Sequence, residues 1–519
     1  MFVRDSNAHR RSTRKRVAEL SARIRAWAAG SDSESLTSGV YRRLIDNSQS
    51  VAHTGQMPPS DDADAEILAE ARAESSLHTS TSGADDAVEA DQAASRQPAP
   101  APKGSLWRDR NFLTMWTGQA FSQFGAQVTE LAIPVLAVLL LNASEFEVGV
   151  LTAANVAAFL IVGLPAGAWI DRMRKRHVMI WADAVRALAL GTVPLLWLLG
   201  MLHIWQLVVV ALIMGIATVF FDVSYQSIIP SLVRPNQIAE ANGKLESTQQ
   251  IAGLTGPAVG GWLIGAITAP IAILATVGTY VISFIALLFT RDHEERRAPE
   301  DHRPIMTEIG EGLRWVFGNP LLRRIVATTG FANLFGTISM TLLPIYLLRV
   351  LELSPAQMGV IFSLGAVGGL LGAIATPRIV KRFGEARTLP LSVIGFSLTP
   401  LLLPVATLVP QIAFPFLVVQ SMLMSFTVLL YNITQVTFRQ RITPPRLLGR
   451  MNASIRFCVW GVMPIAALGA GALGTWLGVV PTLWIAAILE LFAGLFVIIG
   501  PFWRMRDLPD PEPVAAGSA

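Results

Sequence analysis

Two apolar runs joined by a short basic turn decide the fold of this chain: residues 148–199 read VGVLTAANVAAFLIVGLPAGAWIDRMRKRHVMIWADAVRALALGTVPLLWLL. Each run reaches the roughly 20 residues that a helix needs to cross the hydrocarbon core of a bilayer. The whole chain has the same character, since its 519 residues are 52% hydrophobic and only 15% charged. Soluble domains carry about a quarter charged residues. The sequence therefore predicts an all-α polytopic membrane protein.

Further apolar runs recur on both sides of this stretch. At roughly 35 residues for each span with its loop, the chain after its polar N-terminal region accommodates about twelve spans. We expect two six-helix bundles, 106–290 and 323–503, with a cytoplasmic connector, 291–322, and a cytoplasmic tail, 504–519. Within the connector, Ile305–Phe317 has the pattern of an amphipathic surface helix. The spans are expected near 112–141, 148–170, 177–199, 204–229, 238–267, 270–290, 323–348, 355–379, 388–408, 411–438, 450–477 and 481–503.

The N-terminal region differs from the rest in composition. Residues 1–105 are predicted to form a disordered cytoplasmic extension, basic over 1–30 and acidic and of low complexity over 31–102, because this composition cannot bury a core. In the basic part, four apolar residues recur at helical spacing, so it is either a helix lying on anionic lipid or a solvated tail.

Basic residues mark one side of the membrane. Arg172–Arg176 follow the second span and Lys381–Arg387 the eighth, whereas the margins of the alternate loops hold only Arg349. Cytoplasmic loops are the ones enriched in Lys and Arg. We therefore expect a multi-pass protein of the cell (plasma) membrane with both termini in the cytoplasm.

The two halves repeat one another at an offset of 210 residues. Asn242 at the start of the fifth span matches Asn452 at the start of the eleventh, and Gly261 matches Gly471. Parallel repeats about an axis along the membrane normal enclose a central cavity between rocking halves. The repeat therefore predicts a transporter.

Other classes of function lack their signatures. The single cysteine, Cys458, excludes an intrachain disulfide and a cysteine metal cluster. No phosphate-binding loop, nucleophile–base pair or histidine cluster is present, and the basic residues lie in short loops instead of a nucleic-acid patch. We expect no enzyme activity, no cofactor, no metal and no nucleic acid, and a monomer that handles a small molecule and protons in a lipid bilayer.

The turn after the second span carries a specific pattern, Gly167-Ala-Trp-Ile-Asp171-Arg172-Met-Arg174-Lys175-Arg176. This pattern resembles the loop signature of the major facilitator superfamily, with Arg174 where that family has a glycine. The resemblance implies a gating loop in which Asp171 meets the start of the eleventh span and Arg172 a carboxylate of its own bundle; a basic topogenic loop is the simpler alternative. The expected gating residues are Gly167, Asp171, Arg172, Lys175 and Arg176, together with Asp183, Arg186 and Asp222 in the third and fourth spans. For Asp222, a snorkelling carboxylate near the interface is an equal alternative.

The fifth span carries small residues and a proline at Gly243, Gly256, Pro257, Gly260 and Gly261. Proline bends a helix, and glycines let two helices approach closely. The spacing is similar to the antiporter signature of the superfamily, which implies export more than uptake; generic small-residue packing is the alternative.

Two further stretches narrow the resemblance. Ala182–Leu188 and Phe221–Val233 are similar to the macrolide-efflux and enterobactin-exporter branch of drug/proton antiporters. This branch implies proton-driven efflux of small amphiphilic compounds, such as a drug, antibiotic, siderophore or secondary metabolite, and so multidrug resistance. The alternatives are a proton-coupled importer or symporter on the same fold, and a membrane-anchored scaffold or sensor that acts through the N-terminal tail.

Polar residues inside the spans are the candidates for the substrate and proton cavity. Gln119, Gln123, Gln127 and Glu130 follow one stripe of the first span. A carboxylate on such a stripe can bind and release a proton as access alternates, and a structural hydrogen-bonded carboxyl is the alternative. Asn333 and Asn432, on the seventh and tenth spans, are the candidates for the opposite wall.

Overall fold

The computed structural model describes residues 106–170, 173–292, 305–444 and 447–505, apart from the side chains of 164–168, 235 and 305–309. These residues belong to one compact unit, Lys103–Ala519. They contain twelve helices that are long and apolar enough to cross a membrane, and no strand. The prediction of an all-α membrane protein with twelve spans is confirmed. The N-terminal extension lies outside the described residues, as do 506–519 of the expected tail.

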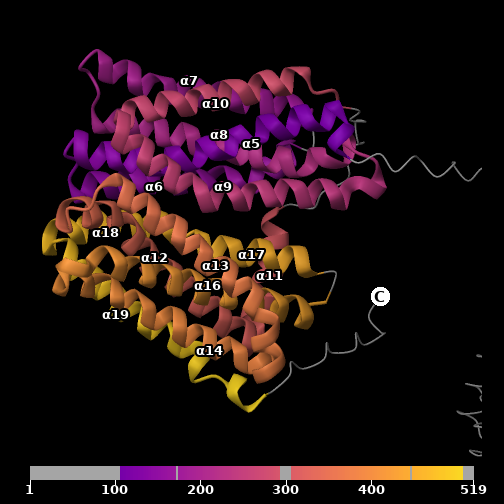
Figure 1. Cartoon of the computed structure of the whole chain (residues 1–519). Helices are drawn as coiled ribbons and strands as arrows, with labels where there is room; N and C mark the ends of the chain where they lie inside the picture. The colour runs from indigo at the N-terminus through magenta and orange to yellow at the C-terminus, as the bar shows by residue number, and fades with distance from the viewer. Residues whose placement is uncertain (1–105, 171–172, 293–304, 445–446, 506–519) are drawn as a thin grey trace, which may run out of the picture. The chain divides into compact units, whose positions relative to one another are not determined.

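The first bundle contains six spans, drawn in indigo to rose in Figure 1. A π-helical turn, η2 (Leu136–Leu140), extends its first helix. The spans are α5 (Arg110–Val135), α6 (Glu145–Ile170), α7 (Lys175–Leu198), α8 (Ile204–Leu232), α9 (Ile238–Ile267) and α10 (Ala269–Phe289).

The second bundle is drawn in orange to yellow and follows the connector helix α11 (Ile305–Gly318), which confirms that a helix forms at the predicted place. Its first span is again extended by a π-helical turn, η4 (Tyr346–Val350). The spans are α12 (Pro320–Ile345), α13 (Pro355–Phe383), α14 (Glu385–Leu398) with the short turns η5 (Thr399–Leu401), α15 (Leu402–Val405) and η6 (Ala406–Leu408), α16 (Ala413–Ile442), α17 (Leu448–Trp460) with α18 (Met463–Leu477), and α19 (Val479–Ile498).

Two spans are interrupted where the sequence had predicted continuous helices. The ninth span leaves the α-helical form at Thr399, next to Pro400 and before Pro404, because proline lacks the N–H that continues the hydrogen-bond ladder. The eleventh span breaks at Gly461, between α17 and α18.

The 210-residue repeat extends to the details of the backbone. The two π-helical turns, η2 and η4, occupy equivalent positions. Left-handed residues follow them at Asn142 (φ 50°) and Glu352 (φ 53°), and another equivalent pair ends the fifth and eleventh spans at Thr268 (φ 80°) and Gly478 (φ 87°). Apart from the two interrupted spans of the second half, both halves therefore fold in the same way, as the sequence predicted.

The spans run between two ends that differ in charge. We call "the basic end" the one at which the described connecting residues 173–174, 233–237, 290–292, 384, 443–444 and 447 lie, and "the opposite end" the one with 141–144, 199–203, 268, 351–354, 409 and 478. Large apolar side chains such as Trp181, Leu188 and Trp476 are 71–80% exposed along the spans. Such an exposed apolar belt is what a surface facing lipid presents.

Candidate transport site

The two bundles share a hydrophobic core at the opposite end. The largest group of buried apolar residues there takes members from both halves, such as Leu136 and Ala211 from the first and Leu342 and Ala470 from the second. Toward the basic end, each of the other four groups is confined to one bundle. Within the described residues, the halves are therefore joined at the opposite end and have separate cores at the basic end.

Two glycine crossings make this junction, and the 210-residue repeat relates them. In the first crossing, a Cβ at Gly149 of α6 would lie 2.7 Å from Ala467 O and 2.9 Å from the Cα of Gly471 in α18. In the second, a Cβ at Gly261 of α9 would lie 3.2 Å from the Cα of Gly359 in α13 and still closer to a backbone oxygen of that helix. Only glycine permits such backbone contact at both places.

The glycines of the predicted antiporter motif serve different partners. A Cβ at Gly256 would lie 2.6 Å from the Cβ of Gln127, and one at Gly260 would lie 3.2 Å from the Cα of Val128, so these two seat α9 on α5 within one bundle. Pro257 and Gly261 face α13 of the other bundle, since a Cβ at Gly359 would meet Pro257 O. Gly243 has nothing within 4 Å of its Cβ position. The motif thus packs one helix on two neighbours, and Gly243 takes no part in the packing.

Along the polar stripe of α5, the side chains become more exposed from Gln119 to Glu130. Gln119 is 4% exposed, and no described group bonds its buried Oε1. Gln123 and Gln127 are half-buried, and Glu130 is exposed. Gln119 differs from the expectation of a cavity-lining residue, because its side chain is buried although it lies on the same side of α5 as exposed Glu130.

Glu130 does not share the apolar exposed face of α5. Phe121 is 50% exposed and precedes Glu130 by nine residues, which places the two side chains on about opposite sides of a helix with 3.6 residues per turn. The same relation holds on α16, where exposed Asn432 follows Leu423, which is 45% exposed, by nine residues. Both polar side chains therefore point away from the faces that suit lipid.

The remaining candidate of the second bundle, Asn333, is half-buried and donates from Nδ2 to Val459 O at 3.4 Å. This bond ties α12 to α17. Two further polar side chains lie inside this bundle. Tyr431 shares a 2.6 Å hydrogen bond with Thr329, and Glu490 is 2% exposed with no described partner for its Oε2. Tyr431 and Glu490 therefore occupy the interior of the bundle, whereas Asn333 remains a candidate for the cavity wall.

The first bundle contains a buried ion pair. Arg186 donates to Asp183 at 2.6 Å across one turn of α7, and both side chains are almost completely buried. The guanidinium carbon of Arg186 lies 4.0 Å from the ring centre of Phe221 and 4.8 Å from that of Tyr280. Asp222 of α8 is half-buried and interacts electrostatically with the same arginine. Three of the predicted gating residues are thus brought together within one bundle.

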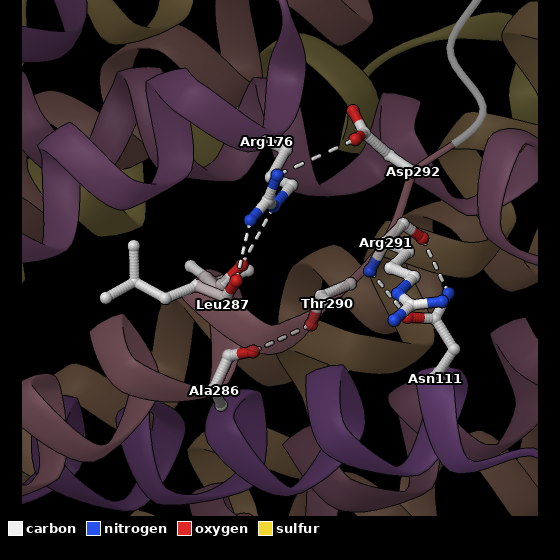
Figure 2. Close-up of polar contacts among 8 residues, drawn as sticks. Asn111, Arg176, Ala286, Leu287, Thr290, Arg291 and Asp292 are labelled. Carbon is white, nitrogen blue, oxygen red and sulfur yellow. Dashed lines mark hydrogen bonds and ion pairs between the residues drawn. The ribbon is translucent and has the colours of Figure 1, made fainter.

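The loop signature is described only in part. Asp171 and Arg172 lie outside the described residues, and Gly167 belongs to α6 without a description of its surroundings. Lys175 begins α7 and Arg176 follows it. Arg176 donates to Leu287 O at 2.9 Å and to Leu288 O at 2.7 Å (Figure 2), so its charge caps the C-terminal end of α10. Asn111 and Arg291 exchange two 2.6 Å hydrogen bonds beside it.

One packing feature was missed in the sequence. Gly365, Gly368 and Gly372 of α13 face α16, and a Cβ at Gly372 would lie 2.7 Å from Phe426 O. A Cβ at Gly368 would meet the backbone of Met422. The signal was present as glycines three and four residues apart, which let two membrane helices touch through their backbones.

Two similar six-helix bundles that cross a membrane and are joined at one end define a membrane transporter. A family model of the Major Facilitator Superfamily matches residues 115–463, and the chain belongs to this superfamily. It is therefore a multi-pass membrane transporter of a family that binds small molecules, and it is not an enzyme.

Relatives with known names point to one branch of the superfamily. The multidrug efflux pump Tap of Mycolicibacterium fortuitum is 26% identical over 400 residues, which are 74% of this chain and 94% of that protein. Macrolide efflux protein A of Streptococcus pyogenes is 24% identical over 372 residues, 69% of this chain and 87% of that protein. The predicted resemblance to a drug-efflux branch is confirmed.

Solved structures agree in fold. A bacterial homologue of the iron transporter ferroportin in an inward-facing state aligns with a TM-score of 0.61 at 17% identity, over 76% of this chain and 99% of that one. The nucleoside transporter NupG also aligns with a TM-score of 0.61, at 14% identity, over 75% of this chain and 98% of that one. At these identities the likeness concerns the fold alone.

Proposed function

We propose that this transporter exports small amphiphilic compounds from the cytoplasm by alternating access, driven by the proton gradient, as a monomer in the cell membrane. The observation that carries the proposal is the junction of the bundles at the opposite end, through the shared core and the two glycine crossings, with separate cores toward the basic end. A transporter in this arrangement is open toward its basic end. Tilting the bundles about the junction would open the other side.

The charges of the connections supply the direction. The basic end carries Arg174, Lys175, Arg234 and Arg291, whereas the described connections of the opposite end contain no Lys or Arg. By the positive-inside rule, the basic end and both chain termini are cytoplasmic. The open side then faces the compartment from which an exporter takes its substrate.

The surfaces between the bundles suit a compound with apolar and polar parts. The rings of Phe159 in α6 and Trp460 in α17 come from different bundles, and their centres lie 6.3 Å apart at 88°. Trp460 is 42% exposed. This pair offers aromatic contacts between the bundles, and exposed Glu130 and Asn432 are our candidates for the few polar contacts that a site for drug-like molecules needs.

Glu130 is our candidate for the coupling residue. It is a carboxylate exposed within a membrane span, on the side away from the apolar exposed face, and such residues are costly unless they meet water or a partner. A proton taken up there from outside and released inside would couple the two fluxes. A structural hydrogen bond of the carboxyl is the alternative, and Glu130→Gln separates the two roles because it keeps a polar side chain and removes the proton site.

The test measures accumulation of erythromycin and ethidium in cells with and without the protein, before and after a protonophore. We expect the protein to lower accumulation, the protonophore to remove the effect, and Glu130→Gln to act as the protonophore does. Glu352→Gln is the matched control, since Glu352 lies in a connection of the opposite end. Accumulation that rises with the protein would favour an importer. Export that survives both the protonophore and Glu130→Gln would exclude proton coupling.

A further inference from the structure

Among the residues that the structure describes, Arg349 is the one basic side chain near the opposite end that bridges the two bundles. It lies in η4 of the second bundle and donates from Nη2 to Val138 O, in η2 of the first bundle, at 2.7 Å. Its side chain is half-buried. The described connections of the opposite end contain no Lys or Arg, so an arginine beside them is unusual and a local contact has to explain its position.

The π-helical turn explains why Val138 O accepts the bond. At the end of η2, the N–H of Leu141 bonds to Leu136 O and that of Ala143 bonds to Ala137 O. Neither of these bonds uses the carbonyl oxygen of Val138, so this oxygen can accept a hydrogen bond from another donor. A buried carbonyl without a donor is costly, and the Arg349 guanidinium meets that need from across the junction.

The repeat shows that this arrangement exists on one side only. In η4, the N–H of Leu351 bonds to Tyr346 O and that of Leu353 to Leu347 O, so the carbonyl of Leu348 is passed over in the same way. The residue equivalent to Arg349 in the first bundle is Leu139, which has no donor and is 46% exposed. The 210-residue symmetry would allow two such bonds, and the chain makes one.

We propose that Arg349 is a positioning residue of the transport cycle, whose bond to Val138 O holds the opposite end closed while the basic end is open. This inference rests on the proposed alternating access, because the bond has to break whenever the two turns separate. The donor of this bond is charged, which makes it stronger than a neutral hydrogen bond, so its loss shifts the ratio of separated to joined molecules about tenfold or more.

The experiment measures the separation of the opposite end directly. Cys458, the single cysteine, is replaced by serine, and Met201→Cys and Leu408→Cys place one spin label on each bundle. Both positions are exposed, at 56% and 72%. Distance distributions from electron paramagnetic resonance in liposomes then report joined and separated molecules as two populations.

Three variants make the test specific. Arg349→Leu copies the equivalent residue of the first bundle, Arg349→Lys keeps the charge, and Arg324→Leu is the control. Arg324 lies on α12 and donates to Phe496 O at 2.8 Å within the second bundle, so it has the same kind of bond without bridging the bundles. We expect the ratio of separated to joined molecules to rise about tenfold in Arg349→Leu, less in Arg349→Lys, and not at all in Arg324→Leu.

Two results would overturn the proposal, and they are distinguishable. If the parent protein shows both populations and Arg349→Leu leaves their ratio unchanged, the role of Arg349 is wrong and alternating access stands. If neither the parent nor any variant shows separated molecules with or without a proton gradient, alternating access is wrong, and the role of Arg349 fails with it.

Discussion

Adding one methyl group at each glycine crossing is expected to move the protein toward a state that is separated at the opposite end. In Gly471→Ala, the new Cβ lies 2.9 Å from both Glu145 O and the Cα of Phe146. In Gly261→Ala, its nearest neighbours are backbone atoms of α13. A backbone atom cannot rotate away as a side chain does, so the helices have to move apart.

The size of the effect follows from this contact. Forcing an extra methyl group into a closely packed contact costs about 1–3 kcal/mol, which the separated state does not bear. Each crossing should therefore change the ratio of the two states by about 5–150-fold. The double variant Gly261→Ala/Gly471→Ala, with spin labels at 201 and 408, should shift most molecules to the longer distance.

The control uses glycines of the same two helices that face open space. Gly265 in α9 and Gly469 in α18 have nothing within 4 Å of their Cβ positions. Gly265→Ala/Gly469→Ala should leave the distances unchanged and keep or raise stability, because alanine favours a helix. The reasoning is refuted if the crossing variant keeps the distances of the parent, or if the control shifts them equally.

Two further outcomes are expected. Asp183→Asn removes the negative charge that lies 2.6 Å from the buried guanidinium of Arg186, so the free energy of unfolding should fall by about 3–5 kcal/mol. Thermal denaturation in detergent measures this, and an unchanged melting temperature would contradict the role of the pair. Deletion of residues 1–102 should leave export of erythromycin intact, and its complete loss in a protein that still reaches the membrane would favour the scaffold or sensor alternative.

Most of the fold could be predicted from the sequence because each membrane span is a long run of apolar residues. An apolar run of fixed length predicts each helix, and the offset of 210 residues predicts that the halves are alike. The interruptions at Thr399 and Gly461 were not predicted, although Pro400 and Pro404 supplied a local signal for the first. Many proline-containing spans of this chain continue through the proline, as α9 does at Pro257, so the residue alone does not decide.

Less of the candidate site could be predicted, because periodicity assigns residues to a face of a helix and does not say what the face meets. Lipid and packed helices are both apolar environments, so the sequence does not show which of the two an apolar helix face contacts. Gln119 and Glu130 share a stripe in sequence, yet one is buried and the other exposed. The bond of Arg349 depends on which carbonyl a π-helical turn leaves without a donor, and residue types do not encode that.

The glycines of α13 have a mechanical consequence. Through Gly359 this helix touches α9 of the other bundle, and through Gly368 and Gly372 its backbone rests on α16. Because no flexible side chain lies between these backbones, a displacement at the crossing with α9 reaches α16, and with it Asn432, almost without slack. A small rotation of α13 about its crossing with α9 at Gly359 therefore moves the distant end of this helix through a larger distance.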